Sequence, residues 1–163
     1  MTNAPEVGSA APDLTLPGLL LDASGTAERR TYRLAEARGR PLVLVFYPGD
    51  GTLVCTRQLC AYTADLDRFT DLGAAVWAVS PQGLDSHERF ARTHRLALPL
   101  LADEEGRAAT AYGVKAPPFG VRRSVFVLDG DGVVRWRHIA RVGLTYRSST
   151  TLAEQVRRLR DGG

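Results

Sequence analysis

The chain alternates between apolar runs and segments of helical periodicity. Residues 41–47 read Pro-Leu-Val-Leu-Val-Phe-Tyr, and residues 74–79 and 124–128 are two further apolar runs. Runs of this length, partly β-branched, indicate strands that are buried on both faces of a sheet. Shorter strand-like stretches occur over residues 13–36, and residues 1–12 are expected to form a loose arm.

The segments between these runs place apolar residues three and four positions apart, which is the spacing of a helix face. Helices are therefore expected over residues 55–72, 106–112 and 150–160. Strands that alternate with helices, followed by a hairpin turn at residues 129–132, predict an α/β fold in which helices cover a mixed central sheet. The expected face of the first helix consists of Leu59, Tyr62, Leu66 and Phe69.

One more helix is expected to begin near Asp85. Asp85 and Glu88 have the spacing of a capping box, in which each side chain bonds to the backbone at the start of a helix. Phe90, Ala91 and His94 would then form the inner face of this helix.

Length and charge constrain the class of protein. The chain has 163 residues and a net charge of +3, which fits one compact domain over residues 1–163. Arginines gather at residues 135–141 and 157–160, but a solvated face explains the second group better than a nucleic-acid surface does. We find no signal segment and no apolar run of membrane-spanning length. We therefore expect a cytoplasmic protein that binds neither nucleic acid nor membrane.

Cys55 stands where a thiol gains reactivity. It follows an apolar strand and the turn residues Pro48-Gly-Asp-Gly51, at the start of a predicted helix. Unpaired N–H groups and the positive end of the helix dipole favour a thiolate there, and the thiolate is the nucleophile. Thr52 lies three residues earlier, and its hydroxyl can accept a hydrogen bond from a group bound beside the thiol or donate one to it. A buried, unreactive cysteine is the alternative, and these residues alone leave both open.

The second cysteine, Cys60, stands five residues after the first. This spacing is not the Cys-x-x-Cys of a general disulfide oxidoreductase. A metal site would need more ligands at suitable spacing, and His87, His94 and His138 are distant in sequence. We therefore expect neither a metal nor a cofactor.

Pro48-x-x-x-Thr52-x-x-Cys55 resembles the active-site motif of the peroxiredoxins. The resemblance is closest to the bacterioferritin comigratory protein, or peroxiredoxin Q, branch of that family. That branch commonly has Pro-Gly where this chain has Leu53-Val54. Further segments that resemble the family, in order along nearly the whole chain, are residues 7–17, Ser86-His-Glu-Arg-Phe-Ala, residues 98–103, Ala111-Tyr-Gly-Val and Arg123-Ser-Val-Phe-Val-Leu-Asp.

The resemblance implies a thioredoxin-like fold with the N-terminal additions of the family. Cys55 would be the peroxidatic residue, shielded by Pro48. Thr52 would orient the peroxide, and Arg123 would hold the thiolate and the substrate oxygen. A fixed guanidinium near sulfur also stabilises the charge that develops on the departing oxygen. From the residues alone, however, a surface role for Arg123 is the better interpretation.

The activity implied by the resemblance is that of a thiol peroxidase acting on hydrogen peroxide or alkyl hydroperoxides, as a monomer or a weak homodimer. Cys60 would condense with the Cys55 sulfenic acid, and thioredoxin or a similar dithiol would reduce the resulting disulfide. Two alternatives stay open. One is a peroxidase that uses Cys55 alone, and the other is a non-enzymatic redox-sensing or chaperone-like module on the same fold.

An intact helix would hold the two cysteines apart. Five residues of helix rise about 7.5 Å and turn by roughly 500°, which places the two Cα atoms about 8.7 Å apart. A disulfide tolerates up to about 7 Å between Cα atoms. We therefore predict two separate thiols in the reduced protein, and unwinding of the first turns after Cys55 when the bond forms.

Overall fold

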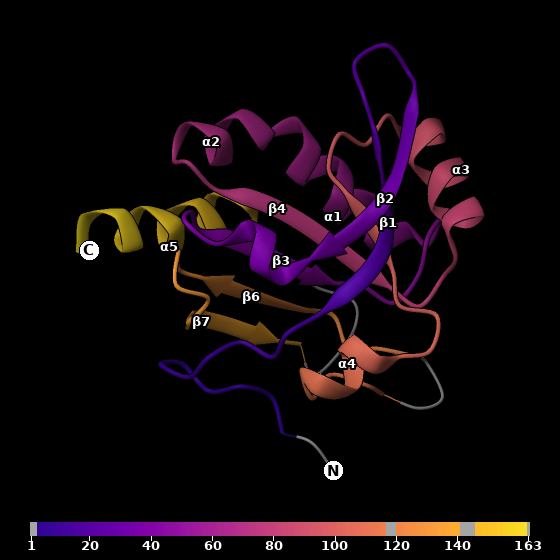
Figure 1. Cartoon of the computed structure of the whole chain (residues 1–163). Helices are drawn as coiled ribbons and strands as arrows, with labels where there is room; N and C mark the ends of the chain where they lie inside the picture. The colour runs from indigo at the N-terminus through magenta and orange to yellow at the C-terminus, as the bar shows by residue number, and fades with distance from the viewer. Residues whose placement is uncertain (1–2, 117–119, 141–145, 163) are drawn as a thin grey trace.

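The fold is built on one mixed sheet, which Figure 1 shows running through the middle of the molecule. The computed structural model describes residues 3–116, 120–140 and 146–162. Within them, β3 lies parallel to β4 and β4 to β5, whereas the other neighbouring strands are antiparallel. The predicted mixed sheet is confirmed. In sheet order the seven strands are β2 (Ala27–Arg33), β1 (Thr15–Leu21), β5 (Leu100–Ala102), β4 (Ala75–Ser80), β3 (Leu42–Phe46), β6 (Ser124–Leu128) and β7 (Val134–Ile139).

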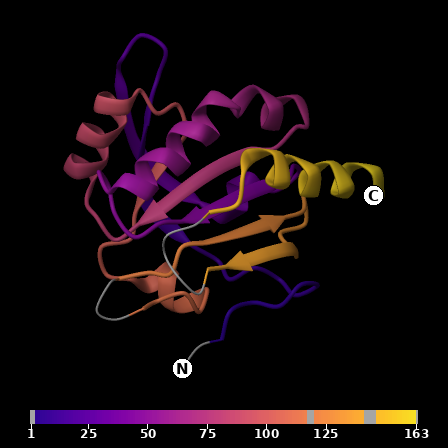
Figure 2. The ribbon, with the colours of Figure 1, turned by 180° about the vertical axis from the view of Figure 1, so that it is seen from behind.

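Helices cover both faces of this sheet. One face packs against α1 (Leu53–Ala64), α2 (Leu66–Asp71), α3 (Leu84–His94) and α5 (Ser149–Gly162). The other face packs against the short 3-10 helix η1 (Leu34–Ala37) and α4 (Arg107–Ala111). Figure 2 shows α5 on the same side of the sheet as α2. No helix in the described ranges is long and apolar enough to cross a membrane.

The central strand β3 is buried on both faces, as its apolar run predicts. Val43 and Val45 belong to the core beneath α1, whereas Leu42, Leu44 and Phe46 belong to the core on the opposite face. None of the five is more than 1% exposed. Full burial of one such side chain contributes about 1.5–3 kcal/mol, so the strand gives the loop that follows it a rigid starting point.

The single helix predicted over residues 55–72 is in fact two helices. α1 begins at Leu53, two residues earlier than expected, and the chain leaves helical geometry at Asp65 (φ −102°, ψ 16°) before α2 begins. The predicted apolar face is confirmed, because all four of its members pack into one core: Leu59, Tyr62, Leu66 and Phe69.

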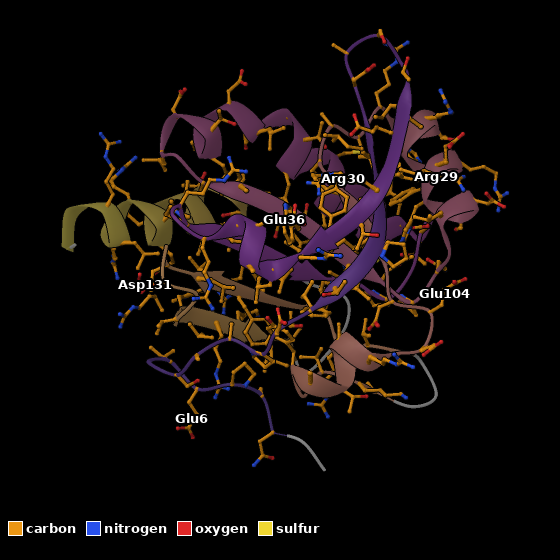
Figure 3. The ribbon with its side chains drawn as sticks, viewed as in Figure 1. Glu6, Arg29, Arg30, Glu36, Glu104 and Asp131 are labelled. Atoms are coloured by element: carbon orange, nitrogen blue, oxygen red, sulfur yellow. The ribbon has the colours of Figure 1, made fainter. Side chains whose placement is uncertain are left out.

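The predicted capping box at the start of α3 is wrong. The residue before this helix is Gly83, and no side chain caps it. Asp85 instead accepts a hydrogen bond at 2.8 Å from Arg29 of β2, which is labelled in Figure 3. Arg29 also lies 3.3 Å from Glu88. These carboxylates therefore tie α3 to the edge of the sheet rather than capping the helix.

The inner face of α3 also differs from the prediction. Phe90 and Ala91 are buried as expected, but His94 is only half-buried. His87 is fully buried instead. It lies one helical turn before Phe90, on the side that faces the end of β3.

The N-terminal arm is not loose. The Gly8 N–H donates to the Val134 carbonyl at 2.7 Å, and the Ala11 N–H donates to the Gly132 carbonyl at 2.8 Å. Gly113 has a φ of +66°, and a Cβ there would lie 2.2 Å from the Ala4 nitrogen, so only glycine lets the arm approach this closely. The arm is thus fixed along β7.

Candidate active site

The loop between β3 and α1 places Cys55 in the first turn of a helix. Thr52 precedes α1 with extended backbone angles (φ −73°, ψ 149°), and its carbonyl accepts a bond from the Thr56 N–H at 2.8 Å. Cys55 is the third helical residue, where backbone N–H groups have no partner within the helix. The predicted placement of this cysteine at a helix start is confirmed.

Arg123 contacts the sulfur of Cys55. Its Nη2 donates to Sγ at 3.2 Å, and the two residues are 4% and 0% exposed. The sheet register explains the contact, because Ser124, next to Arg123, pairs with Phe46 at the end of β3. Arg122 is the exposed member of the arginine pair. Since the pair is shielded from water, the guanidinium favours negative charge on the sulfur more strongly than it would at the surface.

Gln58 is a site residue that the sequence analysis missed. It is fully buried, and its Oε1 accepts a hydrogen bond from Nη1 of Arg123. Its Nε2 donates to the Tyr62 hydroxyl at 3.2 Å, and that hydroxyl donates to the Arg147 carbonyl at 2.6 Å. Burial raises the pKa of Tyr62 to about 12, so the hydroxyl keeps its proton at neutral pH. The available signal was a polar residue on the helix face shared by Cys55 and Tyr62.

A second polar cluster, also missed, fixes the loop before Thr52. The Asp50 side chain is 5% exposed, and its Oδ1 accepts a hydrogen bond from the Tyr47 hydroxyl at 2.6 Å. Its Oδ2 lies 2.6 Å from Nδ1 of His87 and accepts from the Ser86 hydroxyl at 2.8 Å. Burial, together with the Asp50 charge, raises the pKa of Tyr47 well above its usual range, so its hydroxyl remains a donor.

Thr52 and Pro48 lie on the same loop. The Thr52 hydroxyl donates to the Gly49 carbonyl at 3.1 Å, which leaves its lone pairs to accept from another group. Pro48 is half-buried, and shielding of the sulfur by Pro48 stays a prediction. Leu53, in the first turn of α1, is 67% exposed. The Pro-Pro-Phe segment at residues 117–119 lies outside the described residues.

Cys60 lies on the same continuous helix as Cys55, about one and a half turns further along α1. Both cysteines are free thiols, and Cys60 is half-buried. Burial raises the pKa of its thiol. Because α1 runs unbroken through both cysteines, the helix separates their Cα atoms by about 8.7 Å, too far for a disulfide.

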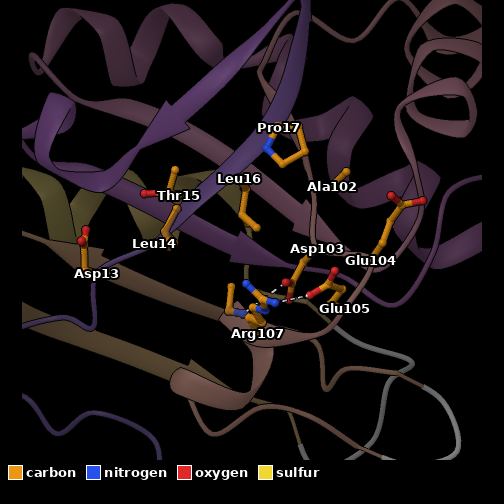
Figure 4. A pocket seen from close by; sticks show the side chains of 11 residues that line it. Asp13, Leu14, Thr15, Leu16, Pro17, Ala102, Asp103, Glu104, Glu105 and Arg107 are labelled. Atoms are coloured by element: carbon orange, nitrogen blue, oxygen red, sulfur yellow. Dashed lines mark hydrogen bonds and ion pairs between the residues drawn. The ribbon is translucent and has the colours of Figure 1, made fainter.

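A separate pocket of about 390 Å³ lies between β1 and α4 (Figure 4). Its lining contains Asp103, Glu104 and Arg107, but none of the residues around Cys55. The buried Asp103 carboxylate accepts hydrogen bonds from the Ala108 and Ala109 N–H groups, so it is already satisfied by the start of α4. We therefore assign no chemistry to this pocket. Among the described residues, no group of three or more His, Cys, Asp or Glu side chains is arranged to hold a metal ion.

The fold and the buried thiol define a thioredoxin-like protein with a cysteine-centred site. Residues 7–137 match the AhpC/TSA family. The chain belongs to that family, and its resemblance to peroxiredoxins of the Q and Bcp type is confirmed.

Similar proteins and structures support this placement. The chain is 38% identical over 131 residues to the chloroplastic peroxiredoxin Q of Oryza sativa subsp. japonica, a match that covers 79% of this chain but only 57% of that protein. It is 32% identical to peroxiredoxin Bcp of Bacillus subtilis, covering 82% of this chain and 86% of that one. Peroxidoxin BcpB from Mycobacterium tuberculosis superimposes with a TM-score of 0.76 at 26% identity, covering 96% of this chain and 97% of that one. AhpC from the same species has a TM-score of 0.88 at 22% identity, over 98% and 95%.

Proposed function

We propose that this protein is a thiol peroxidase that reduces hydrogen peroxide and organic hydroperoxides in the cytoplasm, with Cys55 as the attacking residue. The observation that carries the proposal is the contact between Nη2 of Arg123 and Sγ of Cys55, 3.2 Å apart in a buried site. A buried cation beside a sulfur at a helix start favours the thiolate, which is the form that attacks peroxides.

In the first step the Cys55 thiolate attacks one oxygen of the peroxide. An S–O bond forms as the O–O bond breaks, and the proton of the attacked oxygen passes to the departing oxygen, which leaves as water or an alcohol. The sulfur is oxidised by two electrons to the sulfenate, which becomes the sulfenic acid on taking up a proton. Arg123 stabilises the charge on both oxygens, and the free lone pairs of Thr52 accept a hydrogen bond from the peroxide.

In the second step the Cys60 thiol attacks the sulfenic sulfur. A Cys55–Cys60 disulfide forms and water leaves. A dithiol partner such as thioredoxin then reduces this disulfide by exchange, giving up its own two hydrogens and becoming a disulfide itself.

The rate of the first step tests the proposal directly. Wild-type protein, reduced and mixed with one equivalent of hydrogen peroxide in a stopped-flow instrument, is expected to lose its Cys55 thiol far faster than a free cysteine at the same pH. A redox-sensing or chaperone-like module on the same fold would react no faster than an ordinary thiol. That outcome would overturn the peroxidase proposal.

Replacing Cys60 by serine separates the two steps. We expect Cys60→Ser to keep a fast reaction with one equivalent of peroxide, because Cys60 takes no part in cleaving the O–O bond. Turnover with thioredoxin and its reductase is expected to be lost, because no intramolecular disulfide can form. Cys60→Ala serves as the control for the polarity of the serine. If both variants turn over as fast as wild type, the protein works with Cys55 alone.

Disulfide formation is expected to unwind α1 locally. The segment that must move includes Gln58 and Leu59, which are both fully buried. The free-energy cost of unwinding is therefore larger than it would be if only exposed residues such as Arg57 moved. Amide hydrogen exchange over residues 54–62 should therefore show protected amides from Thr56 onward in the reduced protein, and loss of that protection in the disulfide form. The amides of β3 and β6 should stay protected in both.

Mass spectrometry of the oxidised sample controls this comparison. A confirmed Cys55–Cys60 bond with unchanged protection over residues 54–62 would contradict the unwinding. Absence of the bond after stoichiometric peroxide would remove the resolving role of Cys60.

A further inference from the structure

A buried contact between a carboxyl group and an imidazole ring holds the loop that connects β3 to α1. Asp50 is on the loop between β3 and α1, and His87 is on α3, 37 positions later in the chain. Their side chains are 5% and 0% exposed, and 2.6 Å separates Oδ2 of Asp50 from Nδ1 of His87. Burying a carboxylate is costly unless it is paired and fully hydrogen-bonded, so such a pair is retained where it fixes a structure.

Hydrogen bonds satisfy both side chains of this pair on every side. The Asp50 carboxylate is an acceptor on both oxygens, because Tyr47 donates to Oδ1 and Ser86 donates to Oδ2. The opposite face of the imidazole meets another acceptor, since Nε2 of His87 lies 3.0 Å from the Leu101 carbonyl of β5. Because a carbonyl oxygen can only accept, Nε2 of His87 is the donor to Leu101, and the other ring nitrogen is left for the short contact with Asp50.

The same loop is also held through its backbone. The Asp50 N–H donates to Oε1 of Gln82, and a Cβ placed on Gly49 would lie 3.0 Å from Nε2 of that side chain. The Gly49 carbonyl in turn accepts the bond from the Thr52 hydroxyl. Residues 49–52 are thus fixed from three directions: by the residue that follows β3, by α3, and by Gln82 in the loop that leads into α3.

We infer that Asp50 and His87 are positioning residues for the peroxide reaction. They fix the loop that orients the Thr52 hydroxyl and starts the helix of Cys55, and His87 anchors that loop to β5. This inference rests on the proposed peroxidase function. It assigns a role to two residues that touch neither the sulfur nor the substrate.

The inference is tested by comparing two reactions of the same thiol. Iodoacetamide alkylation needs only the thiolate, whereas reduction of hydrogen peroxide also needs the oriented loop. Asp50→Asn is expected to lower the second-order rate constant for hydrogen peroxide about 10- to 100-fold, the loss typical of a displaced reactive group, while the alkylation rate stays close to wild type. Asp103→Asn is the matched control, because it removes another buried carboxylate that holds α4 instead of the loop.

Two variants of the histidine keep the test valid if Asp50→Asn does not fold. An asparagine amide can occupy the place of Nδ1 and still donate to Asp50, whereas a glutamine amide reaches the place of Nε2 and the Leu101 carbonyl. His87→Asn is therefore expected to retain more peroxide reactivity than His87→Gln.

Each other result overturns the inference. Asp50→Asn with the wild-type rate constant, an equal loss in Asp103→Asn, an equal fall in both reactions, or equal rates for the two His87 variants would each show a role that is only structural. A wild-type protein that reacts no faster than free cysteine would instead refute the peroxidase function itself. The two failures are thus distinguished by the wild-type rate.

Discussion

Cys55→Ser is expected to abolish peroxide consumption completely. Peroxide reduction needs a thiolate that can accept an oxygen atom and exist as a sulfenic acid, and a serine hydroxyl can do neither at neutral pH. The measurement is NADPH-coupled peroxide consumption with thioredoxin and its reductase, followed for wild type and the variant.

Because Cys60→Ser is also expected to lose coupled turnover, the two variants are compared in the reaction with one equivalent of peroxide. There Cys60→Ser is the matched control, because it changes the other cysteine by the same single atom. With one equivalent of peroxide it should react, while Cys55→Ser should not. Turnover that survives in Cys55→Ser would mean that another group performs the chemistry, and the assignment of this site would fail.

The next largest effect is expected for Arg123→Ala. Removing the donor that faces the sulfur and the developing oxygen charge should lower the rate constant for peroxide about 10²- to 10³-fold, as loss of a comparable donor does in other enzymes. Arg122→Ala changes the exposed neighbour and should react as fast as wild type. A stopped-flow comparison of the two variants isolates the effect of the buried guanidinium.

Stability must be compared alongside the rate. Arg123→Ala leaves the buried Oε1 of Gln58 without this donor, and an unsatisfied buried acceptor costs about 1–3 kcal/mol. Thermal unfolding will show whether the variant stays folded at the assay temperature. A folded Arg123→Ala protein that reduces peroxide at the wild-type rate would contradict the role given to this residue.

Most strands and helices could be predicted because the sequence patterns that indicate them are local. β3, β4 and β6 are apolar runs, and the face of α1 repeats at helical spacing whatever it packs against. β5 could not be predicted, because it has three residues, directly after Pro99, and exists only as a partner of β4 and β1. The capping box failed because α3 begins at Leu84, which places Asp85 inside the helix, where its side chain pairs with Arg29 of a distant strand.

The residues of the candidate site also differ in whether local sequence could identify them. Thr52 and Cys55 could be named because they stand within one short motif, and the helix start that surrounds them is a local structure. Gln58 and His87 could not, because their roles depend on contacts across the fold. Gln58 meets Arg123 over 65 positions, and His87 meets Asp50 over 37. A polar residue on an apolar helix face signals such a contact without naming its partner.

The break in helical geometry at Asp65 separates α1 from α2. The Asp65 carboxylate accepts a hydrogen bond from Ser149 at the start of α5, and α2 is held independently by the fully buried Phe69. We therefore expect the unwinding of α1 proposed for the disulfide form to stop at Asp65, because the hydrogen bonds of α2 do not continue those of α1. The free-energy cost of unwinding would then come only from the helical turns between Cys55 and Asp65. A mutation that joined the two helices into one would be expected to slow resolution, and so to lengthen the lifetime of the sulfenic acid.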